Sequence, residues 1–416
     1  MSVVVGQQME RKYDDRGRPQ AAPAPAPTST SVETEPERRY RIPFNRPFIA
    51  GDELESMAQS LASGHFCADG AFTKLCQRYL EKRFSAQQVL LTTSCTAALE
   101  MAALLLEVGP DDEVILPSYT FVSTANAFLL RGARLVFVDI RPDTLNIDET
   151  LVSAAMTSRT KVIVPVHYAG IACEMGTICT IAKERGVYVV EDAAQAFDAR
   201  HNGSCLGTLG DIGTYSFHET KNVVCGEGGA LIVNNPAFRE RAELIREKGT
   251  NRSNFARGEV DKYTWVDVGS SYALADLLAA FLWVQLQNLD VVREGRRLAF
   301  GHYYSALSPL QERGLLRLPM VPEGCEPNYH MFYVLLAQRY DRAAIIKQLQ
   351  RRGIQAVFHF VPLHLSPMGA RLGWTAGSLP ITEDVSRRLL RLPFYCSLSE
   401  SDIDAVATAL SEILRA

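Results

Sequence analysis

The sequence predicts an α/β protein in which helices cover both faces of a large, mostly parallel β-sheet. The first observation is that short apolar runs alternate with helical segments between residues 95 and 234. The second is that these runs consist almost entirely of apolar and β-branched residues, as strands buried on both faces do. The third is a change of pattern beyond about residue 290, which predicts a smaller α+β region.

The first region is expected to contain three helices, at residues 95–109, at 120–132 and in the segment MGTICTIAKERG. Its strands are expected at six apolar runs, which are residues 113–117, 134–140, 161–167, 187–192, 213–218 and 230–234. In open α/β sheets, ligands bind at the carboxyl ends of such strands, where loops lead into helices. Polar motifs at these positions are therefore the first candidates for a site.

The second region begins with a long helix, expected at residues 277–307. Strands are then expected at residues 329–337 and 354–364, with a helix at 341–353 between them. The chain closes with an amphipathic helix for which Ser399 is a plausible N-cap. No internal repeat is visible.

The N-terminal segment differs in composition from both regions. It contains the run AAPAPAPTST, and repeated Ala-Pro forms neither helix nor hydrogen-bonded sheet and offers little apolar surface to bury. We therefore expect a disordered tail over residues 1–40, a large domain over 41–290 and a small C-terminal domain over 291–416.

Composition narrows the function classes. The chain has 416 residues, of which 47% are hydrophobic and 22% charged, as in an ordinary globular protein. Its net charge of −4 and the absence of a Lys/Arg run disfavour nucleic-acid binding. Nine cysteines without CxxC pairs, no signal segment and no long apolar run predict a cytoplasmic protein with no membrane association. No metal-ligand spacing is evident, so no metal is expected.

Two motifs place polar groups at the ends of expected strands. In TTSCTAALE, the turn Ser94-Cys95-Thr96 opens a helix whose free N–H groups suit a phosphate, although an ordinary helix cap has the same sequence. In VYVVEDAAQA, a β-branched strand runs into Glu191 and Asp192. One of these carboxylates is a candidate partner for a pyridinium nitrogen, and a simple helix cap is the alternative.

Two further motifs follow the same rule. PSYTFVSTANA brings Tyr119 and Phe121 past a strand end, where they can stack on a flat ring or fill the core. SFHETKNVVCGEGGA contains Lys221, which is either a covalent cofactor anchor or a solvated cation on a loop. The glycines 226, 228 and 229 of this motif leave space and permit positive φ, and a plain turn before the next strand is the alternative.

The chain order of phosphate turn, aromatic residue, carboxylate and lysine resembles that of fold-type I pyridoxal-phosphate enzymes. The segments PSYTFVST, VPVHYAG, VVEDAAQA, SFHETKN and GEGGA resemble the DegT/DnrJ/EryC1/StrS sugar aminotransferase family over nearly all of residues 42–416. Within that family, IREKGTNRSNFARGEVDKYTW, GSSY and VFHFVPLH are most similar to the transaminases that make dTDP-4-amino-4,6-dideoxygalactose. This resemblance implies a seven-stranded, mostly parallel sheet in the large domain, which would bind pyridoxal 5′-phosphate.

The resemblance also assigns roles to individual residues. It makes Lys221 the Schiff-base lysine and Asp192 the partner of the cofactor's ring nitrogen. The remaining cofactor contacts that it implies are Phe121 against the ring, Gln195 beside the ring's 3-oxygen, and Cys95, Thr96 and Ser216 at the phosphate. The implied reaction is amination of dTDP-4-keto-6-deoxy-D-glucose at C4, with L-glutamate as the amino donor.

The chain departs from the family pattern at two places. Cys95 stands where most members have glycine, so the phosphate turn must accommodate a side chain, as it does in the subfamily named above. The family also commonly has G-x-N-x-R in a segment that reaches a neighbouring subunit's cofactor phosphate. Here Ser271 replaces the Asn and the Arg is missing, which leaves this contact open, although a homodimer with shared sites is expected.

Residues for the nucleotide-sugar are less well defined by the sequence. Lys248, Arg252, Arg257 and Lys262 are candidates to neutralise a diphosphate, and a solvated loop face is an equal alternative for each. Histidines 330, 359 and 364 lie where the resemblance implies the sugar pocket, and a buried, hydrogen-bonded His is the alternative for His330, His359 and His364 alike.

Two other functions agree less well with the sequence than an aminotransferase does. A nucleotide-sugar dehydratase of the same family would have His in place of the anchoring lysine, so Lys221 disfavours it. A non-catalytic regulatory protein that binds DNA is disfavoured by the negative net charge and by the lack of a helix-turn-helix motif or basic patch.

Overall fold

The computed structural model describes residues 40–415, so the tail predicted over residues 1–40 lies, apart from Tyr40, outside the described residues. The part from Tyr40 onward is one compact unit. The predicted boundary at residue 290 falls within the first turn of helix α10 (Leu289–Glu312) and remains a prediction. No helix within residues 40–415 is long and apolar enough to cross a membrane.

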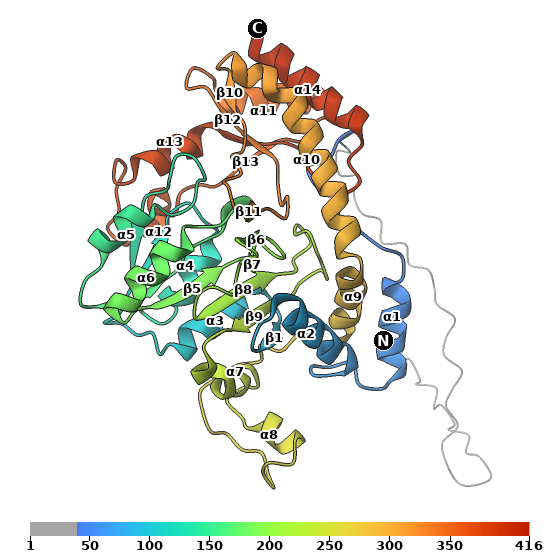
Figure 1. The fold of residues 1–416 in the computed structure, drawn as a ribbon, viewed down its shortest axis with the longest axis vertical. Coiled ribbons are helices and arrows are strands. Elements are labelled where there is room, and N and C mark those ends of the chain that lie inside the picture. The colour runs from blue at the N-terminus through green and yellow to red at the C-terminus, as the bar shows by residue number, and fades with distance from the viewer. Residues whose placement is uncertain (1–39, 416) are drawn as a thin grey trace, which may run out of the picture. The chain divides into compact units, whose positions relative to one another are not determined.

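A seven-stranded sheet with the order β1-β9-β8-β5-β4-β2-β3 forms the centre of the molecule (Figure 1). Its strands are β1 (Val89–Thr92), β2 (Glu113–Pro117), β3 (Arg134–Val138), β4 (Thr160–Ile163), β5 (Tyr188–Asp192), β8 (Ile212–Ser216) and β9 (Gly229–Val233). The pairs from β3 to β8 are parallel, and β9 runs antiparallel to both of its neighbours. The predicted mostly parallel sheet is therefore confirmed, with β1 as a strand that the sequence analysis missed.

Alternate residues of each strand pack into hydrophobic cores on opposite faces of the sheet. Both faces are therefore covered, and the strands have no polar face. Val114 packs in one core with helices α3 (Cys95–Leu105), α4 (Val122–Leu129) and α7 (Arg239–Arg246). Its neighbour Ile115 packs on the opposite face with α5 (Glu149–Ala155) and α6 (Met175–Arg185). The second face continues under α2 (Ala71–Phe84) and α9 (Asp276–Gln287).

A second sheet, antiparallel and four-stranded, has the order β10-β12-β14-β13. Its strands are β10 (Leu316–Arg317), β12 (Tyr333–Leu336), β13 (Val357–Phe358) and β14 (Leu389–Arg391). Leu390 on one face packs with α10 and with α14 (Glu400–Arg415), which Ser399 caps by accepting a hydrogen bond from the Asp402 N–H at 3.2 Å. Leu389 on the other face packs against Tyr119 and Tyr168 from loops of the large sheet.

Several expected elements differ in extent from those in the structure, and three of them show why. The helix predicted over residues 277–307 is two helices, α9 and α10, with a break at Asn288. The strand predicted over 161–167 ends at Ile163, two residues before a proline that has no N–H to donate to the ladder. The strand predicted over 354–364 is reduced to the two residues of β13, and the chain then forms a 3₁₀ turn after Pro362.

The remaining elements are short or peripheral. A small three-stranded sheet has the order β11-β6-β7, formed by Cys325–Glu326, Arg200–His201 and Ser204–Cys205. The other helices are α1 (Glu53–Ala62), α8 (Arg252–Ala256), α11 (Arg342–Arg351), α12 (Pro367–Arg371) and α13 (Pro380–Arg388). Helix α8 lies on an arm, residues 248–271, that extends beyond α7 and is drawn in yellow at the bottom of Figure 1.

Candidate active site

A cavity of about 650 Å³ lies at the carboxyl ends of strands β1, β2, β5 and β8, where the loops after these strands meet β13 and β14 of the second sheet. It brings together nine of the residues that the sequence analysis selected. These are Cys95, Thr96, Phe121, Asp192, Gln195, Ser216, Lys221, His330 and His359. The position agrees with the rule for ligand sites in open α/β sheets.

Ser94 caps helix α3, and the next two residues, Cys95 and Thr96, face the cavity. The Ser94 side chain accepts a hydrogen bond from the Ala97 N–H at 3.0 Å, so the capping role is occupied by this residue. Cys95 and Thr96 line the cavity, and the Thr96 hydroxyl lies 2.7 Å from the Ser123 hydroxyl. Burial raises the pKa of the Cys95 thiol, which keeps this side chain neutral. The N-terminus of an eleven-residue helix therefore opens into the cavity without a competing charge.

Glu191 and Asp192 face opposite sides because consecutive residues of a strand alternate. Glu191 is fully buried and accepts hydrogen bonds from the N–H groups of residues 207, 209 and 210 and from His167. Asp192 points into the cavity, where its carboxylate accepts a hydrogen bond from Thr124 at 2.7 Å and from the Ala194 N–H at 3.1 Å. Of the two carboxylates, only Asp192 is placed to meet a ligand.

Lys221 lines the same cavity as Asp192. Burial lowers the pKa of the Lys221 amine, and the Asp192 carboxylate acts in the opposite direction. A lowered pKa favours the neutral amine, which is the nucleophilic form. Of the three glycines that follow, Gly226 alone has positive φ, at 84°, whereas a Cβ on Gly229 would lie 2.4 Å from the backbone of Ser94 and Cys95.

The two aromatic residues after β2 have different environments. Tyr119 is buried in the core between the two sheets, with its hydroxyl bonded to the backbone carbonyl of His359. Phe121 lines the cavity and is 58% exposed, so its ring face is free for a flat ligand. Near it, the Gln195 side chain accepts a hydrogen bond from the Ala169 N–H at 2.8 Å, which orients its amide at the cavity wall.

Two of the three candidate histidines belong to the cavity. His330 shares a hydrogen bond of 3.0 Å with the Asn222 side chain, and His359 one of 2.9 Å with the Tyr168 hydroxyl. Burial, followed by the positive charges of Lys221 and Arg391, lowers the pKa of both imidazoles well below the usual range. Both rings are therefore neutral at physiological pH and can serve as hydrogen-bonding groups.

The other predicted substrate residues do not line the cavity. His364 is buried between the Ser118 hydroxyl, at 2.7 Å, and the Glu383 carboxylate, at 3.2 Å. The basic residues and Ser271 all lie in or beside the arm, at positions 248, 252, 257, 262 and 271. Arg257 is paired there with Glu243 and Glu259, each at 2.8 Å. Within one chain, the site and the basic arm are therefore separate.

Sequence reasoning missed Thr124 and Arg391. Thr124 holds the Asp192 carboxylate and was hidden inside a segment that gives only a helix signal. Arg391 lines the cavity from the end of β14. The available signal for it was an arginine interrupting the apolar run LLRLPF.

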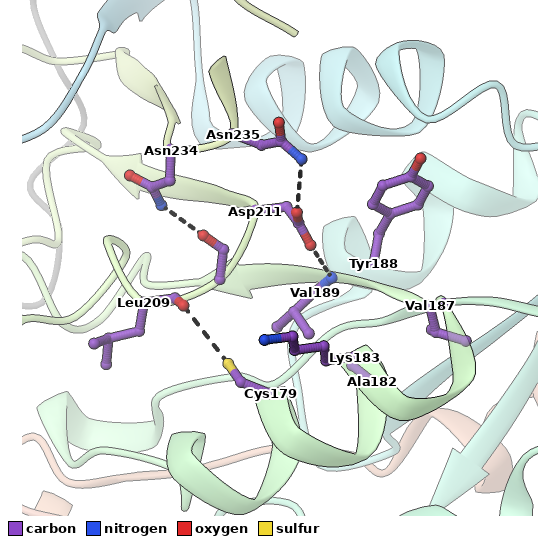
Figure 2. A pocket seen from close by; sticks show the side chains of 12 residues that line it. Cys179, Ala182, Lys183, Val187, Tyr188, Val189, Leu209, Asp211, Asn234 and Asn235 are labelled. Carbon is purple, nitrogen blue, oxygen red and sulfur yellow. Dashed lines mark hydrogen bonds between the residues drawn. The ribbon is translucent and has the colours of Figure 1, made fainter. Parts of the chain in front are cut away.

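A second depression lies at the opposite ends of β5 and β8, and Lys183 is among the residues that line it (Figure 2). Asp211 accepts hydrogen bonds there from the Val189 N–H at 2.9 Å and from the Asn235 side chain at 3.0 Å. Asn234 donates to the Gly210 carbonyl at 3.0 Å. The side chains of Asp211, Asn234 and Asn235 are therefore engaged in hydrogen bonds within the protein. Within residues 40–415, no group of three His, Cys, Asp or Glu side chains could hold a metal ion.

Comparison with known proteins agrees with this geometry. Residues 47–411 match the DegT/DnrJ/EryC1/StrS aminotransferase family. The chain is 31% identical over 387 residues to the spore coat polysaccharide biosynthesis protein SpsC of Bacillus subtilis, covering 91% of this chain and 98% of SpsC. The aminotransferase TlmJ from Streptoalloteichus hindustanus is 33% identical with a TM-score of 0.83, over 90% of this chain and 99% of TlmJ.

A further solved structure bears on the cofactor. Spr1654 of Streptococcus pneumoniae is 26% identical with a TM-score of 0.84, over 90% of this chain and 99% of Spr1654, and is known in a PLP form and a PMP form. The cavity fits this cofactor, since an amine, a carboxylate, an exposed aromatic ring and a helix N-terminus open into one space. The predicted fold type, cofactor and class of nucleotide-sugar aminotransferase are confirmed, and the chain belongs to the DegT/DnrJ/EryC1/StrS family of pyridoxal-phosphate-dependent sugar aminotransferases.

Proposed function

We propose that this enzyme transfers the amino group of L-glutamate to C4 of a dTDP-4-keto-6-deoxyhexose, with dTDP-4-keto-6-deoxy-D-glucose as the substrate. The product is the corresponding dTDP-4-amino-4,6-dideoxyhexose. The observation that carries the proposal is that Lys221 and Asp192 share one cavity with the exposed ring of Phe121 and the N-terminus of α3. The choice of sugar rests on the resemblance of segments 245–265 and 357–364 to the dideoxygalactose transaminases.

The proposed chemistry divides between the cofactor and the residues of this chain. Pyridoxal phosphate, when bound, supplies an electron sink for the carbon that loses its proton. Lys221 would hold the cofactor covalently, and its amine, once released, would take up and return the proton of the donor's α-carbon. Asp192 would keep the cofactor's ring nitrogen protonated. Cys95, Thr96 and Ser216 would hold the phosphate, Phe121 would cover the ring, and Gln195 would contact its 3-oxygen.

The sugar is proposed to bind against His330 and His359. Both imidazoles are neutral, so they offer hydrogen bonds to hydroxyl and keto groups without attracting a second anion. Because the His364 side chain is hydrogen-bonded to Ser118 and Glu383, we propose that it supports the pocket wall and does not contact the sugar.

We infer that the nucleotide is held with the help of a second subunit. The basic residues Lys248, Arg252, Arg257 and Lys262 do not reach the cavity of their own chain. They share their arm with exposed apolar side chains, of which Trp265 is 77% exposed. Both observations support a homodimer in which the arm, including Ser271, completes the partner's site.

The alternatives have less support. A dehydratase of this family would need a different base where Lys221 stands. A DNA-binding regulator would need a basic surface, and the net charge is −4. We also propose a reducing, cytoplasmic location, which nine free cysteines support.

The test is to incubate the purified enzyme with pyridoxal phosphate, L-glutamate and dTDP-4-keto-6-deoxy-D-glucose, and to determine the product's structure by NMR. We expect an amine at C4 together with one equivalent of 2-oxoglutarate. The Lys221→Ala variant is expected to form no amine. A 3- or 4-deoxy product, or turnover by Lys221→Ala at the wild-type rate, would contradict the proposal.

A further inference from the structure

The imidazole ring of His330 lines the cavity and has a single hydrogen-bond partner within residues 40–415. That partner is Asn222, the residue after Lys221, whose side-chain Oδ1 lies 3.0 Å from the Nδ1 atom of His330. The other ring nitrogen, Nε2, has no partner in this part of the chain, and it is not one of the unpaired polar atoms that are sealed from solvent. Nε2 is therefore the atom that His330 offers to a ligand in the cavity.

The buried amide of Asn222 can take only one orientation. Its Nδ2 lies 2.6 Å from the backbone carbonyl oxygen of Asn328, and a carbonyl oxygen can only accept a hydrogen bond. Asn328 is itself held, because its side-chain Nδ2 donates to the carbonyls of Gln195 and Phe197, each at 3.0 Å. The NH₂ group of Asn222 is thus committed to Asn328, and its oxygen faces His330.

This orientation determines the tautomer of His330. An amide oxygen can only accept, so the Nδ1 atom of His330 must carry a proton and donate it to Asn222. Burial and the nearby positive charge of Lys221 lower the pKa of the imidazole well below the usual range, so the ring carries no second proton at physiological pH. Nε2 is therefore an uncharged acceptor. His359 has no such constraint, because its partner is the Tyr168 hydroxyl, which can donate or accept.

We propose that Nε2 of His330 accepts a hydrogen bond from the C3 hydroxyl of the sugar substrate, and that Asn222 is the positioning residue that keeps this nitrogen unprotonated. The inference rests on the proposed aminotransferase function. It names a determinant of substrate selection, because the site would then favour sugars with a free hydroxyl beside the keto carbon.

The chemistry of the other groups leaves the C3 hydroxyl as the best match. A bare nitrogen does not attract a carboxylate or a diphosphate, and the C4 keto oxygen has no proton to donate. Because the charge of Lys221 acts on His330, the ring lies near the amine that C4 must approach. Of the two carbons bonded to C4, C3 carries a hydroxyl, whereas C5 carries the ring oxygen and a methyl group. The C2 hydroxyl is one carbon farther away.

The first test compares sugars on the wild-type holoenzyme. Without the 3-hydroxyl, Nε2 would remain unpaired in the closed complex. We therefore expect kcat/KM for the 3-deoxy analogue of dTDP-4-keto-6-deoxy-D-glucose to be about 10–100-fold lower than for the parent sugar. The 2-deoxy analogue should stay within about threefold of the parent.

The second test removes the acceptor. His330→Phe keeps an aromatic ring but has no nitrogen, so the parent and 3-deoxy sugars should react within about threefold of each other. The half-reaction with L-glutamate, followed by stopped-flow absorbance, should stay within about threefold of wild type. His302→Phe is the matched control, because the His302 side chain lies on α10 and pairs with Asp404 at 2.7 Å. This control should keep the preference for the parent sugar.

The third test concerns Asn222. Asn222→Leu has a side chain of similar size but removes the acceptor for Nδ1–H, so the proton can move to Nε2. The preference for the parent sugar over the 3-deoxy sugar should then fall to within about threefold. Nitrogen-15 NMR of enzyme labelled at histidine reports the tautomer directly, and the signals lost in His330→Phe identify this ring. We expect a bare Nε2 in wild type and a protonated Nε2 in Asn222→Leu, a change that a role in packing alone would not produce.

The assignment would be overturned by a wild-type enzyme that converts the 3-deoxy sugar as fast as the parent, or by a selective loss with the 2-deoxy sugar instead. A protonated Nε2 in the wild-type enzyme would overturn it as well, and so would a His330→Phe variant that still discriminates. A wild-type enzyme that aminates none of these sugars would contradict the proposed function, so the two failures are distinguishable.

Discussion

At the scale of single residues, the proposed chemistry depends on Asp192 remaining a carboxylate that points into the cavity. The Thr124 hydroxyl and the Ala194 N–H each donate to it, at 2.7 and 3.1 Å, and these two hydrogen bonds fix its orientation. Its neighbour Glu191 is held on the far side of the strand. The charge that faces the cofactor is therefore fixed by one side chain.

Asp192→Asn keeps the size of the side chain but removes its charge. The cofactor's ring nitrogen would then no longer be kept protonated, so we expect kcat to fall by about 10²–10³-fold, equivalent to about 3–4 kcal/mol of transition-state stabilisation. The measurement is steady-state kinetics together with thermal unfolding. Asp112→Asn, which removes a partly exposed partner of Lys161 at 3.0 Å, is the control and should leave kcat unchanged. A variant at position 192 with wild-type kcat would contradict this role.

At the scale of elements, the site depends on the close approach of strand β9 to the turn before α3. A Cβ on Gly229 would lie 2.4 Å from the Ser94 carbonyl carbon and from the Cys95 nitrogen. Both are backbone atoms, which a side-chain rotation would not move. Only glycine at position 229 therefore allows the N-terminus of α3, which we propose as the binding site of the cofactor phosphate, to lie this close to β9.

Gly229→Ala should accordingly push this turn away from the sheet. We expect a loss of about 1–3 kcal/mol in the free energy of unfolding, as is typical of overpacking, and weaker binding of pyridoxal phosphate. The matched control is Gly301→Ala, since a Cβ at that position in α10 would meet nothing within 4 Å. This control should gain about 0.5–1 kcal/mol because alanine favours a helix. Denaturant unfolding and cofactor titration measure both quantities, and equal stabilities for the two variants would contradict the packing argument.

The sequence predicted most of the large sheet because its strands are short, wholly apolar runs, most of them separated by clear helices. Asp192 and Lys221 could be selected because Asp192 is the last residue of β5 and Lys221 lies in the loop that follows β8. Arg391 could not, because β14 has only three residues and pairs with strands that are distant in sequence. The four basic residues of the arm were plausible from charge alone, but residue type carries no information on which cavity they reach.

At the scale of the whole molecule, the arm around α8 is the feature that a single chain leaves unexplained. It exposes a group of large apolar side chains, namely Phe255, Tyr263, Trp265, Val266 and Val268. Exposed apolar patches of this kind mark interfaces in soluble proteins. The proposed homodimer would bury this patch and bring the basic residues of the arm to the partner's cavity.

Replacing Trp265 and Val268 together by serine should therefore weaken the dimer. Burial of each side chain contributes about 1.5–3 kcal/mol, and a symmetric interface counts each twice, so we expect the dissociation constant to rise by at least about 10³-fold. Sedimentation velocity over a dilution series measures this change. Leu298→Ser, at a site on α10 that is 57% exposed, is the control. A wild-type protein that sediments as a monomer at all concentrations would contradict the shared-site dimer.

The central claim is that Lys221 is the covalent anchor of pyridoxal phosphate, and peptide mapping after borohydride reduction tests it most directly. Reduction of the holoenzyme fixes the cofactor to its lysine, and digestion followed by mass spectrometry locates the modified peptide. We predict one modification, on the peptide that contains Lys221, and its disappearance when L-glutamate is added before borohydride. Cofactor mass on a different lysine, or on none, would contradict the account.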